Sequence, residues 1–421
     1  MKPCRRIAVT IAFAVLSVAL APVLAGAACQ MIMPGDPGGK ANTIIFKGCN
    51  IEINNGSGSA ATINGLGNLT VGYNETRGGG DDRRTGSHNV VVGDRQNFTS
   101  HGGLVVGYQN ETSAAYATVN GGSENIASGS YAAIAGGRVN RASGSYGSVT
   151  GGQYGVAAGG SSMVLGGWNN QARANFATVA GGKDNVATST TPADPYALAY
   201  SSVLGGLANT ASGVTSVVAG GASNEASGES SSVSGGSVND ASGAYCWVGG
   251  GTSNEALINS DVVTGGYNNR ASGGHASVTG GSNNFASASS ATVSGGDSND
   301  ATGEKSVVSG GINNEASAEN AAVSGGSGNV ASGESSSVSG GANNEASGIY
   351  TAVAGGVSNQ ATLNGASVLG GLSNSATASY ATVSGGSTNE ANGNNSSVSG
   401  GYAHTTTGIN DWRAGGYYQD Q

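Results

Sequence analysis

The chain is poor in the residues that fill a wide hydrophobic core. Aromatic residues make up 5% of its 421 residues and charged residues 10%, whereas glycine occupies 77 positions. Such a composition excludes a large globular core of Leu, Phe and Trp. Glycine and serine at this level would favour disorder if they were unpatterned, but here they recur at fixed offsets. The sequence therefore predicts a thin, repetitive core.

Basic residues are scarce once the N-terminus is set apart. Residues 1–27 resemble a secretory signal peptide, because Lys2, Arg5 and Arg6 precede an apolar stretch and a small-residue cleavage site at 25–27. An uncleaved anchor is the alternative. Cleavage leaves 13 of the 16 basic residues beside all 25 acidic ones, a net charge of about −12. That balance disfavours nucleic acid as a partner. We expect a secreted or bacterial cell-surface (outer-membrane) protein without a membrane-spanning segment after cleavage.

Cysteines are few, and no residues are arranged for catalysis. Cys29 and Cys49 flank a short segment ahead of the repeats and are candidates for a disulfide in an oxidising compartment. Cys246 is interpreted as a buried free thiol, because its column otherwise holds mostly Ser and Ala. The four histidines lack metal-ligand spacing, and no hydrolase or zinc motif occurs. We therefore expect no enzyme activity, catalytic residue, metal or cofactor.

The dominant feature that is present is a short repeat. Glycine recurs every 15 residues from Gly205 to Gly415 and from Gly121 to Gly181, and two 14-residue steps run from Gly93 to Gly121. A fixed short period is typical of stacked identical coils rather than of a globule with one buried site. The 22 anchor glycines predict an all-β parallel roll of about 22 coils, on the order of 100 Å long.

Each coil carries the same residue types in the same order, so that each position forms a column along the stack, as the coil around Gly235 illustrates. Val233 and Ser231 precede the glycine pair and are two residues apart, so in a strand their side chains share one face. Both are expected to point inward. Asn239 follows the pair and is expected to form a turn with left-handed backbone, and its amide to stack into a ladder with those of other coils. Ala241 should point inward opposite the valine. The glycine pair itself predicts a sharp turn.

The residue after the turn asparagine is often acidic. Stacked coils would align these residues into a broken stripe, whose members are Glu225, Asp240, Glu255, Asp300, Glu315, Glu345 and Glu390. Solubility and protection of the sheet from association are the favoured interpretation. Weak cation binding is the alternative, although the stripe lacks the dense oxygen ligands of a calcium loop.

Breaks in the period define the domain boundaries. The step from Gly181 to Gly205 is 24 residues, which predicts an exposed insertion loop near 188–196. The charges of a second irregular stretch, 74–88, are interpreted as solvating a loop. We therefore expect a signal peptide at 1–27, an N-terminal cap with irregular first coils at 28–85, a β-roll repeat domain at 86–416 and a C-terminal tail at 417–421.

The repeat unit resembles a known family. The pattern Ser-Val-Ser-Gly-Gly-x-x-Asn-x-Ala-Ser-Gly, at 232–243 and 337–348, resembles the head repeats of YadA-like trimeric autotransporter adhesins. The resemblance implies a left-handed parallel β-roll, a homotrimer and binding to extracellular matrix or cell-surface ligands. Those heads typically repeat every 14 residues, whereas most coils here have 15. The family's heptad stalk and C-terminal membrane-anchor strands are not recognised.

These features together predict an adhesin-like structural protein. Its repetitive surface would attach to matrix, cells or other surfaces by multivalent contact. The alternative is an ice- or crystal-surface-binding repeat protein, because a rigid Ser, Thr and Ala array can match a lattice. Bulky residues such as Trp247 and Val307 interrupt that array and make this alternative the weaker one.

Overall fold

The computed structural model describes residues 30–189 and 200–415, and every regular element among them is a β-strand. Two compact units divide at residue 53. The described part of the first unit contains one antiparallel pair, β1 (Gln30–Ile32) with β2 (Ile45–Lys47). The second unit contains the repeats. The predicted signal peptide, Cys29 and the 417–421 tail lie outside the described residues, as does most of the predicted insertion at 188–196.

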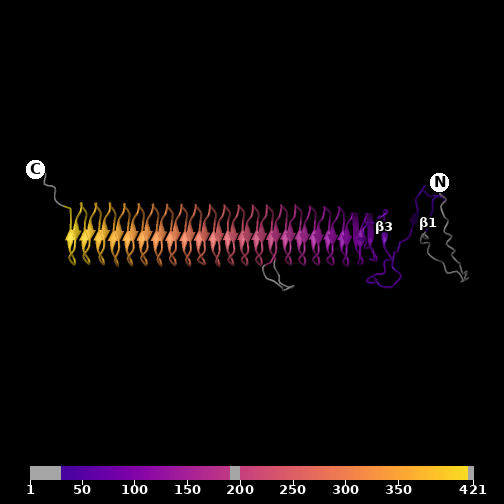
Figure 1. The fold of residues 1–421 in the computed structure, drawn as a ribbon, viewed down its shortest axis with the longest axis horizontal. Helices are drawn as coiled ribbons and strands as arrows, with labels where there is room; N and C mark the ends of the chain where they lie inside the picture. The colour runs from indigo at the N-terminus through magenta and orange to yellow at the C-terminus, as the bar shows by residue number, and fades with distance from the viewer. Residues whose placement is uncertain (1–29, 190–199, 416–421) are drawn as a thin grey trace, which may run out of the picture. The chain divides into compact units, whose positions relative to one another are not determined.

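The second unit is a parallel β-solenoid built from two ladders of short strands (Figure 1). The first ladder begins with β3 (Leu69–Val71), β4 (Val90–Asp94) and β6 (Leu104–Tyr108). Two-residue strands follow every 15 residues from β8 (Thr118–Val119) to β16 (Thr178–Val179), and again from β18 (Ser202–Val203) to β46 (Trp412–Arg413). Apart from β3, this ladder consists of the even-numbered strands from β4 to β46.

The odd-numbered strands other than β1 and β3 form the second ladder. It begins with β5 (Asn97–Phe98) and β7 (Glu111–Thr112), and two-residue strands then repeat every 15 residues from β9 (Ile126–Ala127) to β17 (Val186–Ala187) and from β19 (Thr210–Ala211) to β45 (Thr405–Thr406). This ladder has 21 strands. The all-β parallel fold and its 14- to 15-residue repeat are thus confirmed, and the 22 anchor glycines bound 21 turns. The left-handed sense stays a prediction.

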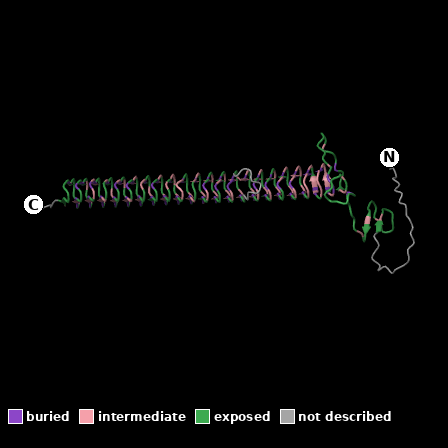
Figure 2. Ribbon diagram, turned by 90° about the horizontal axis from the view of Figure 1, so that it is seen from below, coloured by how far each residue is buried: buried purple, intermediate pink, exposed green. Residues whose placement is uncertain are grey.

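The core is a column of valines facing a column of alanines. In each regular coil the second residue of the first-ladder strand is a fully buried Val or Ile, and that of the second-ladder strand is in nearly every coil a fully buried Ala. Val233 and Ala241 are 1% and 0% exposed, and Ser231, two residues before the valine, is also buried. The predicted inward positions are confirmed. Figure 2 shows this buried strip continuing along the stack between exposed turns.

The asparagine that recurs in the coils is part of this core rather than of the exposed turn. Asn239 is 1% exposed, and the residue before it, Val238, takes the left-handed conformation with φ of 57°. The predicted left-handed backbone at the asparagine is therefore wrong by one residue. The physical reason is that the inward asparagine side chain bonds backbone groups of two coils, whereas the Val238 side chain at the turn has no polar group to satisfy.

Each asparagine hydrogen-bonds the backbone of its own coil and of the next. The Asn239 side-chain Nδ2 donates to the carbonyl of Gly235 in the same coil at 2.9 Å and to that of Gly251 in the next at 3.0 Å. Its Oδ1 accepts the backbone N–H of Asn254 at 3.0 Å. The predicted ladder exists, but it runs mainly from side chain to backbone. Because every donor and acceptor of the amide is used, its burial carries no unsatisfied group.

The irregular stretch 74–88 docks on the first coils instead of merely solvating a loop. The Arg77 guanidinium, whose side chain is 12% exposed, donates to the carbonyls of Arg95, Gln109 and Asn110 at 2.7–2.8 Å. It also lies 3.8 Å from the buried Glu111 carboxylate. The interpretation of these charges as simple solvation is therefore incomplete, because one arginine clamps two successive turns.

Removing one inward asparagine should loosen the stack locally. Asn344→Ala leaves the buried N–H of Asn359 and the carbonyls of Gly340 and Gly356 without this partner, at a cost of about 2–4 kcal/mol. Hydrogen exchange of the segment 340–361 should accelerate. Asn343→Gly is the matched control, because that neighbour is exposed and left-handed at φ of 55°. Equal exchange in both variants would contradict the ladder's role.

The two glycines of a pair should differ sharply in tolerance. Gly341 has φ of +86°, and a Cβ there would collide with the carbonyl oxygen of Gly356 in the next coil. A Cβ on Gly340 would meet no atom within 4 Å. We expect Gly341→Ala to cost at least about 2 kcal/mol and Gly340→Ala less than about 1 kcal/mol. Thermal unfolding measures both, and a reversed order would contradict the stacking geometry.

Candidate functional site

The outward surface of the solenoid consists of parallel columns, one residue per coil. Two columns come from the strands, as with Ser232 before Val233 and Asp240 before Ala241. A third follows the glycine pair, where single residues such as Leu207, Ala222 and Ser237 form parallel bridges from coil to coil. Because coils stack about 4.8 Å apart, each column is an evenly spaced row of side chains. A binding site on the repeat surface would therefore be made of side chains from neighbouring rows.

The turn around the glycine pair carries exposed apolar side chains, and we call this surface the Gly–Gly edge. Leucines stand on both sides of the pair in two coils, at 204 and 207 and again at 369 and 372, with 47–56% of each exposed. Further members are Leu165, Trp168, Tyr267, Ile312, Val357 and Tyr402. Exposed apolar side chains repeated along one edge are typical of an association surface.

The turn that leads back from the second ladder to the first carries an aromatic ladder. The rings of Tyr116, Tyr131 and Tyr146 stack with centroids 5.0 Å apart, and His101 packs edge-on against Tyr116 at 5.2 Å. Each tyrosine has left-handed backbone, with φ near 58°. Such in-register stacking stabilises neighbouring turns. The 15-residue spacing of the three tyrosines is the sequence signal that would have identified it.

The acidic stripe is aligned as predicted, but it forms separate groups. Glu225, Asp240 and Glu255 lie on three successive strands of the second ladder, and Asp300 and Glu315 lie on two. Burial, and then repulsion from Glu225 and Glu255, raise the pKa of Asp240 to about 6. Among the described residues no three acidic, histidine or cysteine side chains are arranged to hold a metal ion.

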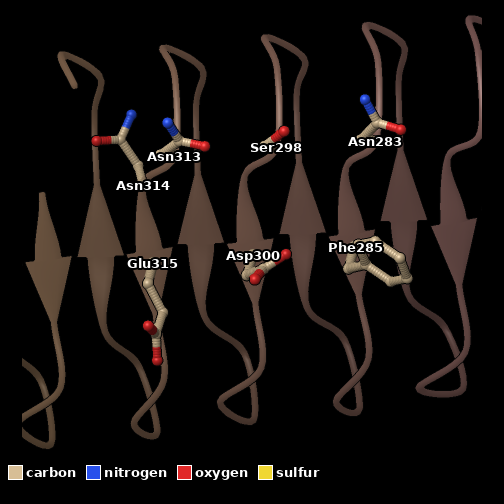
Figure 3. Close-up of a pocket in the computed structure, with 7 residues that line it drawn as sticks. All are labelled: Asn283, Phe285, Ser298, Asp300, Asn313, Asn314 and Glu315. Atoms are coloured by element: carbon tan, nitrogen blue, oxygen red, sulfur yellow. The ribbon is translucent and has the colours of Figure 1, made fainter. Parts of the chain in front are cut away.

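A shallow groove of about 350 Å³ crosses three coils of this surface (Figure 3). One row of its lining consists of Phe285, Asp300 and Glu315, which are in register on β29 (Phe285–Ala286), β31 (Asp300–Ala301) and β33 (Glu315–Ala316). A second row, from the left-handed turn positions, consists of Asn283, Ser298 and Asn313. The groove therefore combines one aromatic ring, two carboxylates and a row of amides and hydroxyl. We call it the Phe285 groove.

A buried carboxylate escaped the sequence analysis. Asp261 occupies the inward Ser/Ala column with 0% exposure, and its oxygens accept the backbone N–H groups of Ile258 and Ala276 at 2.9 and 2.8 Å. Burial raises the pKa of this carboxyl. Cys246, one coil earlier in the same column, donates its thiol to the Ile258 carbonyl at 2.9 Å. Burial raises the pKa of Cys246 to about 11, which fits the buried, unreactive thiol that its column predicts.

The remaining predicted site residues are placed as follows. Cys49 lies in the first unit, and because Cys29 is outside the described residues the disulfide between them stays a prediction. The part of the chain that the structure describes contains no helix long and apolar enough to cross a membrane.

Comparison of the sequence with protein-family models and with curated proteins finds no match in either. The fold alone therefore defines the class of this protein as a parallel β-solenoid.

The crowded carboxylates should make stability depend on pH. Below about pH 3 Asp240 is protonated in both the folded and the unfolded chain. As the pH rises toward 6, the unfolded chain ionises first and the folded state is penalised. Asp240→Asn removes that penalty. We expect the variant to gain on the order of 1 kcal/mol near pH 7 and progressively less toward pH 4.5, because partial exposure screens the repulsion.

Thermal midpoints at both pH values measure this effect. Glu390→Gln is the matched control, because it removes one carboxylate from the same column where the neighbouring strands place Ser375 and Thr405. A pH-independent gain in Asp240→Asn, or an equal gain in Glu390→Gln, would contradict the repulsion.

Proposed function

We propose that this protein is a secreted or cell-surface, adhesin-like structural protein that attaches by presenting its repeated side-chain rows. The observation that carries the proposal is the in-register repetition of outward columns through the whole stack. A row of weak contacts repeated at fixed spacing binds through multivalency, without one deep pocket. The signal-peptide-like N-terminus and the resemblance to YadA-like heads support the same function.

Lateral association of identical chains is part of this proposal. The Gly–Gly edge exposes large apolar side chains on a chain whose own core is only Val, Ala and small residues. A partner covering this edge over its length has to repeat with the same coil spacing, and a second copy of the chain does so by construction. Copies related by rotation about an axis that runs parallel to the solenoids and between them would close into a ring. The family resemblance favours three copies.

The oligomeric state tests this assembly directly. Light scattering on purified residues 28–421 should give three times the chain mass. Replacing Leu204, Leu207, Leu369 and Leu372 by Ser should weaken association by on the order of 1 kcal/mol for each leucine in each chain, so that the variant dissociates at concentrations at which the wild type stays assembled.

The control variant replaces exposed apolar residues by Ser on the turn that leads from the second ladder back to the first. Ile258, Ile349 and Leu363 are 44–49% exposed there, and their replacement by Ser should leave the mass unchanged. A monomeric wild type would contradict the assembly.

Attachment is tested separately: if the wild-type protein binds neither extracellular matrix, cells nor abiotic surfaces, the adhesin-like function is wrong.

A further inference from the structure

The Phe285 groove contains one aromatic ring, in an outward column whose other members are charged, polar or aliphatic. Phe285 is the only aromatic residue at this position among the described two-residue strands of the second ladder, and 37% of it is exposed. A phenyl ring in this outward row contributes nothing to the Val/Ala core. Its exposed face is available to a ligand that has an apolar face of its own.

Three of the polar side chains that line the groove have no side-chain partner among the described residues. Neither the Asp300 nor the Glu315 carboxylate makes a side-chain hydrogen bond or ion pair among the described residues, and the Asn313 amide makes none either. In contrast, Asn283 is engaged, accepting from Asn268 at 2.8 Å and donating to Ser282 at 2.9 Å. The free groups thus lie on the two coils that follow the phenyl ring.

The mixture of these free groups indicates the chemistry of the ligand. Carboxylates accept hydrogen bonds, whereas the Asn313 amide both donates and accepts. Hydroxyl groups have the same dual character, so a hydroxyl-rich ligand can use the whole set. A cation would use the carboxylates and the ring but would leave the amide N–H groups unused. The lining therefore favours an uncharged, hydroxyl-bearing ligand with an apolar face, which describes a pyranose ring.

We propose that the Phe285 groove binds an uncharged, extended oligosaccharide that lies along the solenoid axis. One ring stacks on Phe285, and the next rings hydrogen-bond Asp300, Glu315 and Asn313. Successive coils are about 4.8 Å apart, close to the advance of one ring in an extended glycan, so each coil meets one sugar. The groove volume of about 350 Å³ lies within the range of small-ligand sites.

This inference rests on the proposed attachment function and names the class of ligand for one stretch of the surface. The test uses the full mature chain, with linear β-1,4-linked hexasaccharides of glucose and of N-acetylglucosamine as probes, in titration calorimetry. We expect saturable binding to at least one of them. Phe285→Ala should weaken it about tenfold or more, whereas Phe285→Tyr, which keeps the ring, should preserve it.

Matched variants separate this groove from other exposed aromatics. Phe176→Ala removes a phenyl ring that is 41% exposed on another column and should leave binding unchanged. Asp300→Asn with Glu315→Gln keeps acceptors but removes both charges, so saccharide binding should change only a few-fold and should depend little on salt. Hexalysine is the cationic probe.

The outcomes decide between the alternatives. No binding of either hexasaccharide, or binding that Phe285→Ala leaves intact, overturns the proposal. Salt-sensitive binding of hexalysine that is lost in the charge-neutral double variant assigns the groove to cations and also overturns it. Attachment of the wild type to cells or matrix without saccharide binding would reject this ligand class while leaving the adhesin-like function standing. Failure of both would reject that function as well.

Discussion

The fold depends on the inward asparagine that nearly every coil carries, with Gly155 at the same position in one coil. Its side chain is bonded to the carbonyl of its own glycine pair, to the carbonyl of the next pair and to the backbone N–H of the next asparagine. The solenoid core is too thin for apolar burial alone to fix the distance between coils, since it consists of Val, Ala and small residues. The asparagine supplies a directional bond that holds each coil in register with the next. That register is what makes every outward column straight.

The close approach of successive glycine turns follows from the same interaction. The second glycine of each pair presents its carbonyl to the asparagine of the preceding coil, so no Cβ fits at this point. Glycine is thus required by the stacking distance as well as by its positive φ. Nearly invariant Val, Asn, Ala and Gly columns leave the outward positions free to vary without disturbing the stack. The outward surface can therefore change one side chain at a time, as Phe285 in its column illustrates.

Much of the architecture could be predicted from the sequence, because a repeat of this regularity shows each structural constraint many times. Val233 and Ala241 are inward because every coil has the same pair in the same place. The local preference of asparagine for left-handed backbone favours a turn position because that preference is a property of one residue. Its actual bonds connect two coils. Arg77 was missed for a similar reason: its carbonyl partners lie 18–33 residues away along the chain. The Phe285 groove is lined by the turn row as well as by the neighbouring strand column. Because the acidic stripe is defined from the strand column alone, it does not reveal the groove.

The most direct test of this account is a crystal structure of the mature chain at a resolution that distinguishes side-chain rotamers. We predict that the asparagine of every regular coil points inward and bonds the glycine carbonyls of two successive coils, with about 4.8 Å between coils. Asparagine side chains that point to solvent, or coils stacked out of the 15-residue register, would contradict the account.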